Sequence, residues 1–153
     1  MAILKIQTGE KNPILRKKSV NVKKFDANLK KFVKNLRETM VKKDGLGLAA
    51  PQVGENIRAI TVAMNYGGEN KVIVAMVNPV ISWHGEEILI AEEGCLSLPG
   101  IFKNVERFKE LKVEFFTVEG ERSILKLEGL NARVIQHEID HLDGILFTDR
   151  VKE

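Results

Sequence analysis

The stretch Gln136-His-Glu-Ile-Asp-His-Leu-Asp143 determines how the rest of this 153-residue chain is interpreted. It contains His137, Glu138 and His141 in an H-E-x-x-H pattern, which places the two imidazoles one turn apart on one face of a helix. Two imidazoles at that spacing can bind one metal ion, and the neighbouring carboxylate can handle the protons of a water at that ion. The same residues can also share a helix by chance, so the interpretation depends on a third ligand.

The residues before this pattern favour a helix. Leu130 and Val134 precede His137 and His141 at helical spacing, so an apolar stripe continues into the histidine pair. Gly144 follows at the point where the helix is expected to end.

Composition bounds the class of protein. The 24 Lys and Arg against 21 Asp and Glu give a formal net charge of +3, which is mildly basic and far from a nucleic-acid-binding signature. One cysteine excludes an internal disulfide and favours a reducing cytoplasm. No apolar run approaches the roughly 20 residues that span a bilayer, and residues 1–10 lack the features of a signal peptide. We therefore expect one cytoplasmic domain over residues 1–153.

Apolar residues recur at spacings of three and four over residues 25–43 and predict a helix there, with Asp26 as its N-cap. Asn12 and Pro13 predict one short helical turn through Arg16. The opposite face of the longer helix is basic. We interpret it as a solvated face, with docking on RNA or the ribosome as the alternative. Its basic residues are Lys23, Lys30, Lys31, Lys34 and Arg37.

Strand patterns occupy much of the chain between the two helices. Residues 57–64 and 71–78 are expected to pair as a hairpin around residues 65–70, and further strands are expected over 81–92, 111–117 and 123–128. Adjacent hairpins with one helix early and one late favour an α+β fold. The expected architecture is antiparallel β-sheets packed around the H-E-x-x-H helix, with one N-terminal helix.

The third metal ligand has to come from upstream. A metzincin would need a histidine where Phe147 stands, and the glutamate-type zincins need a Glu on a later helix, for which residues 142–153 leave little room. Cys95, the only thiol, lies between an expected strand and the Pro99-Gly100 turn, where it can project into a cleft. A thiolate with two imidazoles leaves a fourth metal position open for water. The alternative is a small buried apolar side chain.

Residues 44–54 form a loop rich in glycine and alanine. The loop lacks the G-K-[ST] end of a P-loop, and Ala50 stands where the third glycine of a dinucleotide-binding fingerprint would be. Gln52 is the polar side chain of this apolar loop. From the loop alone we interpret its side-chain amide as one that hydrogen-bonds within the turn.

Residues 45–52, 93–97 and 136–141 together resemble the three signature motifs of the peptide deformylases, in that family's order. The similarity extends to Asn78-Pro79 and to residues 144–147, and it spans nearly the whole chain. It implies a single catalytic domain that removes the N-formyl group from the N-terminal formyl-methionine of nascent polypeptides and releases formate.

The resemblance also implies the metal site. Cys95, His137 and His141 would hold one divalent metal ion that carries a water. Fe2+ is the physiological ion that the family implies, and the ligand set also accepts Zn2+, Ni2+ or Co2+.

Catalytic roles follow from the same resemblance. Glu138 would take the proton of the water and deliver it to the leaving amine. The side-chain amide of Gln52 and the backbone N–H of Leu96 would stabilise the oxygen that gains charge.

The family binds its peptide in an extended conformation, with main-chain hydrogen bonds that would come here from Leu46, Gly47 and Gly94. Leu130 and Val134 would line the pocket for the methionine side chain, with Leu46 and Leu48 closing it. These apolar residues are equally explained as core.

Two departures from the family pattern change the expectations. Phe102 stands where many bacterial members carry an arginine near the outer end of the substrate, with Lys103 next and Arg107 further on, so preference beyond the first residue is open. Many members also continue into a C-terminal helix associated with ribosome docking, whereas this sequence ends at Glu153. Transient ribosome contact is therefore expected to be weaker or to use the lysine-rich helix.

Two other functions compete with this interpretation. One is a zinc endopeptidase, which the missing downstream ligand disfavours. The other is a non-catalytic metal-binding or ribosome-associated module, which would be expected to lose Glu138, Gln52 or a ligand. The expected partners are formyl-methionyl nascent peptides, with no membrane and no specific nucleic acid.

Overall fold

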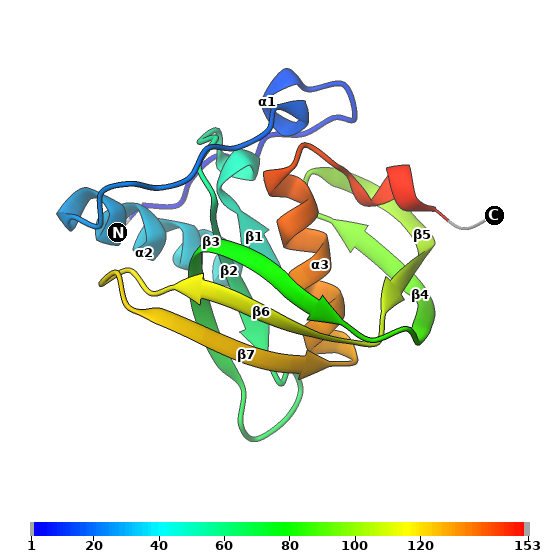
Figure 1. Cartoon of the computed structure of the whole chain (residues 1–153). Coiled ribbons are helices and arrows are strands. Elements are labelled where there is room, and N and C mark those ends of the chain that lie inside the picture. The colour runs from blue at the N-terminus through cyan, green and yellow to red at the C-terminus, as the bar shows by residue number, and fades with distance from the viewer. Residues whose placement is uncertain (1, 152–153) are drawn as a thin grey trace.

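The structure is a computed structural model that describes residues 2–151 of the chain. A five-stranded antiparallel sheet of order β1-β2-β3-β6-β7 and a two-stranded sheet of β4 and β5 lie on different sides of helix α3 (Figure 1). The helices are α1 Pro13–Arg16, α2 Ala27–Lys42 and α3 Leu130–Leu142, with 3-10 turns η1 Ala50–Val53 and η2 Phe147–Arg150. The strands are β1 Gly47–Ala49, β2 Ala59–Met64, β3 Val72–His84, β4 Ile88–Cys95, β5 Leu98–Phe108, β6 Glu110–Phe116 and β7 Arg122–Glu128.

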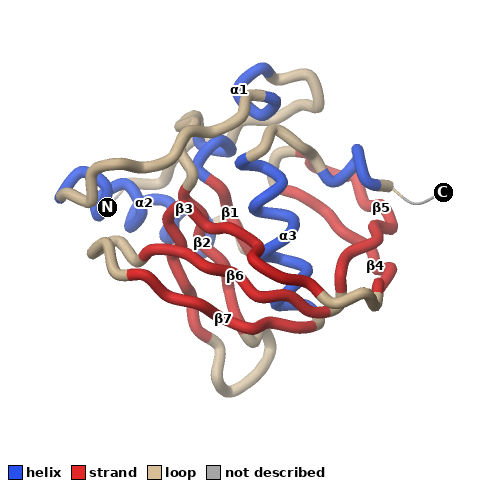
Figure 2. The backbone as a smooth tube through the Cα atoms, viewed as in Figure 1, coloured by secondary structure: helices blue, strands red, loops and turns tan. Residues whose placement is uncertain are grey.

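Helix α3 is central, as the sequence predicts. Every residue from Ala132 to Leu142 is buried, because the five-stranded sheet covers one side of the helix and β5 contacts another (Figure 2). Ile135 and Ile139 pack against Ile60 of β2 and Val113 of β6 in the main core cluster. Truncation of one such side chain typically costs about 2–5 kcal/mol. His137 and His141 therefore lie on a helix whose position is fixed by core packing.

Helix α2 confirms the predicted early helix, which begins at Ala27. The Asp26 side chain accepts a hydrogen bond from Leu29 N at 3.0 Å and so caps the first turn. The apolar face of α2 contributes Leu29, Val33 and Met40 to the core, against the five-stranded sheet.

The expected strand over residues 81–92 is wrong in its bounds. Strand β3 continues through Pro79 to His84, and β4 begins only at Ile88. The register of β3 against β6 shifts between Val77 and Val80, and Asn78 has a φ of 51°. A proline at such a β-bulge removes no ladder hydrogen bond, which is why the strand does not end there.

The expected turn at Pro99-Gly100 is also wrong, because both residues lie inside β5. The chain reverses between Cys95 and Leu98, which are paired across the two-stranded sheet, so Leu96 and Ser97 form the turn. Residues 44–54 are likewise more than a loop, since β1 pairs with β2 there. Among residues 2–151, no helix is long and apolar enough to cross a membrane.

Candidate metal centre and active site

Cys95, His137 and His141 lie together, with one ligand atom from each within 4.8 Å of the others. The end of β4 supplies the thiol and α3 supplies both imidazoles. Cys95 Sγ is 3.3 Å from His141 Nε2. Both histidines are buried and the cysteine is half-buried. One thiolate and two imidazoles form a donor set for a borderline divalent ion with an open coordination position, so the residues fit the metal that the sequence implies.

The two histidines have opposite electrostatic environments. Burial and the positive charges of His137 and Arg107 hold the pKa of His141 well below its usual value, so its Nε2 lone pair is free to bind an ion. Burial alone would also lower the pKa of His137, but its hydrogen bonds with Cys95 and Glu93 raise it to about 10. Metal binding at His137 must therefore displace a proton.

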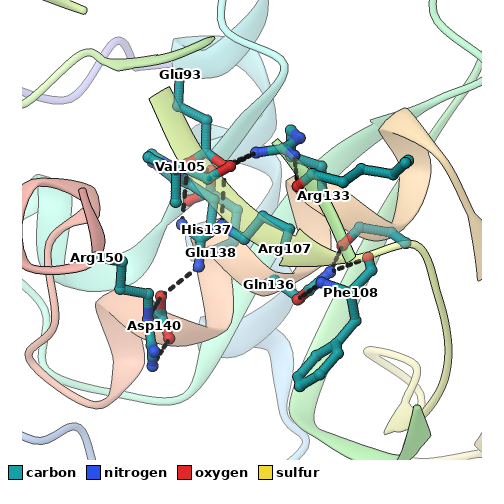
Figure 3. A network of polar contacts seen from close by, with 12 residues as sticks. Glu93, Val105, Arg107, Phe108, Arg133, Gln136, His137, Glu138, Asp140 and Arg150 are labelled. Atoms are coloured by element: carbon teal, nitrogen blue, oxygen red, sulfur yellow. Dashed lines mark hydrogen bonds and ion pairs between the residues drawn. The ribbon is translucent and has the colours of Figure 1, made fainter. Parts of the chain in front are cut away.

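Glu93 orients His137 through the imidazole nitrogen Nδ1. Glu93 Oε1 lies 2.9 Å from His137 Nδ1, and the same carboxylate accepts hydrogen bonds from Arg107 at 2.8 and 2.9 Å and from Arg133 at 2.7 Å (Figure 3). Burial would raise the pKa of Glu93, but Arg107 and His137 hold it well below its usual value. A carboxylate fixed in this way sets the orientation of an imidazole that binds a metal.

The same buried network ties the β4–β5 hairpin to α3. Arg107 Nη1 donates to Asp140 at 2.6 Å, and Arg150 Nε donates to the same oxygen at 2.6 Å. Arg133 donates to main-chain carbonyls of β4 and β5 at 2.8 and 2.9 Å. We did not predict Arg107 or Arg133 as site residues from the sequence. One signal for Arg107 exists in the sequence. Side chains two positions apart in a strand point to the same face, and Arg107 lies two positions after the buried Val105.

Glu138 is buried beside the cluster without being one of its three members. Its Oε2 is 4.0 Å from His137 Nε2, and within the described part of the chain its Oε1 has no hydrogen-bond partner. Burial raises the pKa of Glu138 to about 7, against the opposing charge of His137. The β1 strand passes directly over it, because a Cβ added at Gly47 would lie 2.6 Å from Glu138 Oε2.

Gln52 is held by its loop and directed at the cluster. Its Oε1 accepts a hydrogen bond from Ala49 N at 2.9 Å, as expected of a turn amide. Its Nε2 donates to Ser97 Oγ at 3.1 Å and lies 3.4 Å from Cys95 Sγ. The amide is therefore fixed in orientation next to the thiol.

A cleft of about 570 Å³ opens above the cluster. Cys95, His137, Glu138, Gln52 and Leu96 all line it. The residues that the sequence assigned to substrate binding line it too: Leu46, Gly47, Gly94, Leu130 and Val134. The expectation for Leu48 is wrong, since this residue is fully buried in a core cluster with residues of α2.

The outer part of the cleft carries Phe102, which is 60% exposed. Its ring packs on Gly94, where an added Cβ would lie 2.6 Å from Phe102 Cε1. Arg107 is buried with Glu93 and cannot reach this outer region.

Comparisons with known proteins show which family the chain belongs to. The family model "Polypeptide deformylase" matches residues 3–153. The peptide deformylase of Thermotoga neapolitana is 48% identical over 141 residues, which cover 92% of this chain and 83% of that protein. Chloroplastic peptide deformylase 1B of Oryza sativa is 45% identical over 141 residues, which cover 92% of this chain and 52% of that protein. The crystal structure of Thermotoga maritima peptide deformylase has a TM-score of 0.93 at 44% identity and covers 100% of both chains.

The family match spans almost the entire chain, and the Thermotoga maritima structure shares its fold as well as its sequence. The chain therefore belongs to the peptide deformylases, metal-dependent hydrolases that remove the N-formyl group from nascent polypeptides.

Proposed function

We propose that Cys95, His137 and His141 hold the metal ion of this deformylase and that Glu138 is its general base. The observation that carries the proposal is the convergence of three ligand atoms within 4.8 Å at a cleft that Glu138 also lines. The ion would be Fe2+ under physiological conditions, with Zn2+, Ni2+ or Co2+ as substitutes that the same donors accept.

A divalent ion at this position supplies Lewis acidity that makes water in the cleft easier to deprotonate. Glu138 accepts that proton on its carboxylate and later delivers it to the amine that leaves with the peptide. Two features support the role: Oε1 is buried without a hydrogen-bond partner among residues 2–151, and burial raises the pKa of Glu138 to about 7. A carboxyl group with a pKa near the working pH can both take and return a proton.

The Gln52 side-chain amide and the Leu96 backbone N–H stabilise the formyl oxygen as it gains negative charge. Gln52 is suited to this role because the hydrogen bond from Ala49 N fixes its Oε1, and its Nε2 is held 3.4 Å from Cys95 Sγ at the cleft that both residues line. A donor that is already oriented needs no reorganisation during the reaction.

The peptide lies extended in the cleft. Leu46, Gly47 and Gly94 provide main-chain hydrogen-bond partners, and Leu130 and Val134 contact the methionine side chain. The residues after methionine leave the cleft along its outer part, past Phe102.

The substrates are nascent formyl-peptides, and the protein acts on them in the cytoplasm. Residues 1–153 form one catalytic domain. Transient contact with the ribosome belongs to the same proposal.

Metal stoichiometry tests the ligand set independently of turnover. We expect wild type to bind one equivalent of Ni2+ and Cys95→Ala to bind it far more weakly, since one of three ligands is lost. A Cys95→Ala variant with one equivalent bound at normal affinity would refute the assignment. Cleavage of an internal, unformylated peptide by metal-loaded wild type would instead support the endopeptidase alternative.

A further inference from the structure

The positive charge of the chain is concentrated in one region. Residues 17–43 carry ten Lys and Arg against two Asp and Glu, whereas the rest of the chain carries fourteen against nineteen. The small net charge of +3 is therefore the sum of a basic region and an acidic remainder. Separation of this kind favours binding of a polyanion at the basic region.

Helix α2 displays much of this charge in an ordered array. Lys30, Lys34 and Arg37 follow one another at helical spacing and are exposed, with Lys31 exposed beside them. In the described part of the chain, no ion pair involves a basic residue of α2. These cations are therefore free to meet a ligand.

The array continues into the segment that precedes the helix. A hollow of about 740 Å³ lies between residues 20–24 and the N-terminal half of α2. Its polar lining consists of Lys23 and Lys24, the amide side chains of Asn21 and Asn28, and one acidic residue, Glu55. The remaining lining is apolar and comprises Val20, Val22, Leu29, Phe32 and Ile57, so the cations lie at the rim of an apolar hollow. These lysines and amides are donors that suit phosphate and ribose oxygens.

The packing of α2 argues against a membrane as the polyanion. A helix that lies in a membrane interface inserts a free apolar face. The apolar face of α2 is buried instead, with Leu29, Val33 and Met40 in the core, and Val41 is the exposed large apolar residue that the helix retains. A rigid row of cations without an apolar face fits a phosphate backbone.

We propose that a basic face, formed by Lys30, Lys31, Lys34 and Arg37 of α2 with Lys23 and Lys24 of the preceding segment, binds the phosphate backbone of double-stranded RNA without sequence preference. The substrates of this enzyme are nascent polypeptides, which emerge from an RNA-rich particle. RNA binding at this face rests on the action of the enzyme on nascent polypeptides and does not depend on which residues bind the metal or catalyse the reaction.

The location of the basic face lets RNA and peptide bind together. Helix α2 lies at the end of the molecule opposite the β4–β5 hairpin (Figure 1). It ends at Lys42, and the chain enters the cleft lining two residues later, at Asp44. Asp44 and Glu92 contribute carboxylates to the cleft lining, whereas no basic residue of α2 lines it. RNA bound along α2 would thus leave the cleft open to a peptide.

The test is binding of a short fluorescent RNA duplex, followed by anisotropy over a range of salt concentrations. The patch variant is Lys30→Gln/Lys31→Gln/Lys34→Gln. The matched control is Lys71→Gln/Lys112→Gln/Lys126→Gln, which removes the same charge outside the basic face. We expect the patch variant to bind about tenfold more weakly and to lower the salt slope by about 3, while the control binds as wild type does.

Wild-type affinity in the patch variant would overturn the proposal, and so would an equal loss in both variants. Tighter wild-type binding to phosphatidylglycerol vesicles than to RNA at equal phosphate would also overturn it, in favour of a lipid surface. Formate release from free formyl-Met-Ala-Ser should be unchanged in both variants. That readout separates failure of this proposal from failure of the active-site assignments.

Discussion

Gly47 and Glu138 approach so closely that no side chain fits at residue 47. A Cβ there would lie 2.6 Å from Glu138 Oε2 and 2.8 Å from its Cγ. Strand β1 and helix α3 thus meet at the proposed base, and the backbone of β1 limits where that carboxylate can move.

Gly47→Ala should therefore displace Glu138 while leaving the metal ligands in place. We expect kcat/KM for a formyl-peptide to fall about a hundredfold, because a shift of about 1 Å at a reacting group has an effect of that size. Metal content should stay at one equivalent. Gly68→Ala, in the turn after β2, is the control and should retain full activity. Full activity in Gly47→Ala would show that the contact does not position Glu138.

Glu93→Gln should weaken metal binding without altering a ligand. The carboxylate that orients His137 loses its charge, and loss of such a partner typically lowers metal affinity about 10–100-fold. Arg107 and Arg133 also lose a buried counterion, so the variant should be destabilised by about 3–5 kcal/mol in urea unfolding. Competition with a chelator measures the affinity. Glu92→Gln, exposed and adjacent, is the matched control, and an equal effect there would contradict the account.

Metal uptake should depend on pH in a definite direction. The pKa of His137 is raised to about 10, so at neutral pH this imidazole carries a proton that must leave before an ion binds. Apparent metal affinity should therefore rise as the pH rises towards 10. Calorimetry in buffers with different heats of ionisation measures the protons released. Metal binding without proton release would contradict the raised pKa of His137.

Phe102 should influence the substrate beyond its first residue. Its exposed ring forms part of the outer cleft on the backbone of Gly94. Phe102→Ala should lower kcat/KM about fivefold for formyl-Met-Ala-Phe, since burial of apolar surface against the ring is lost. The value for formyl-Met-Ala should change little. An equal drop for both peptides would assign Phe102 a structural role instead.

The parts of the fold and site that the sequence predicts are those with local patterns. The α3 helix follows from spacing within one segment. Its end at Leu142 follows from Gly144 two residues later, which has the positive φ of 74° that glycine accommodates. Cys95 was found because it is the only thiol. The signal for the helix lies in a few neighbouring residues, and the signal for Cys95 lies in the count of one cysteine in the sequence.

The parts that were missed depend on pairing between distant residues. Arg107 and Arg133 meet Glu93 from 14 and 40 positions away, and no local pattern indicates such an ion pair. Strand β5 was missed because Pro99 and Gly100 are typical turn residues. The register between Cys95 and Leu98 places the turn earlier and keeps both residues in the strand.

Formate release from formyl-Met-Ala-Ser under anaerobic conditions tests the central claim most directly, with metal-loaded wild type and Glu138→Gln assayed side by side. We predict rapid release by wild type and a loss of about 10²–10⁴-fold in a variant that still binds one metal equivalent. No release by metal-loaded wild type, or equal rates in the two proteins, would contradict the account.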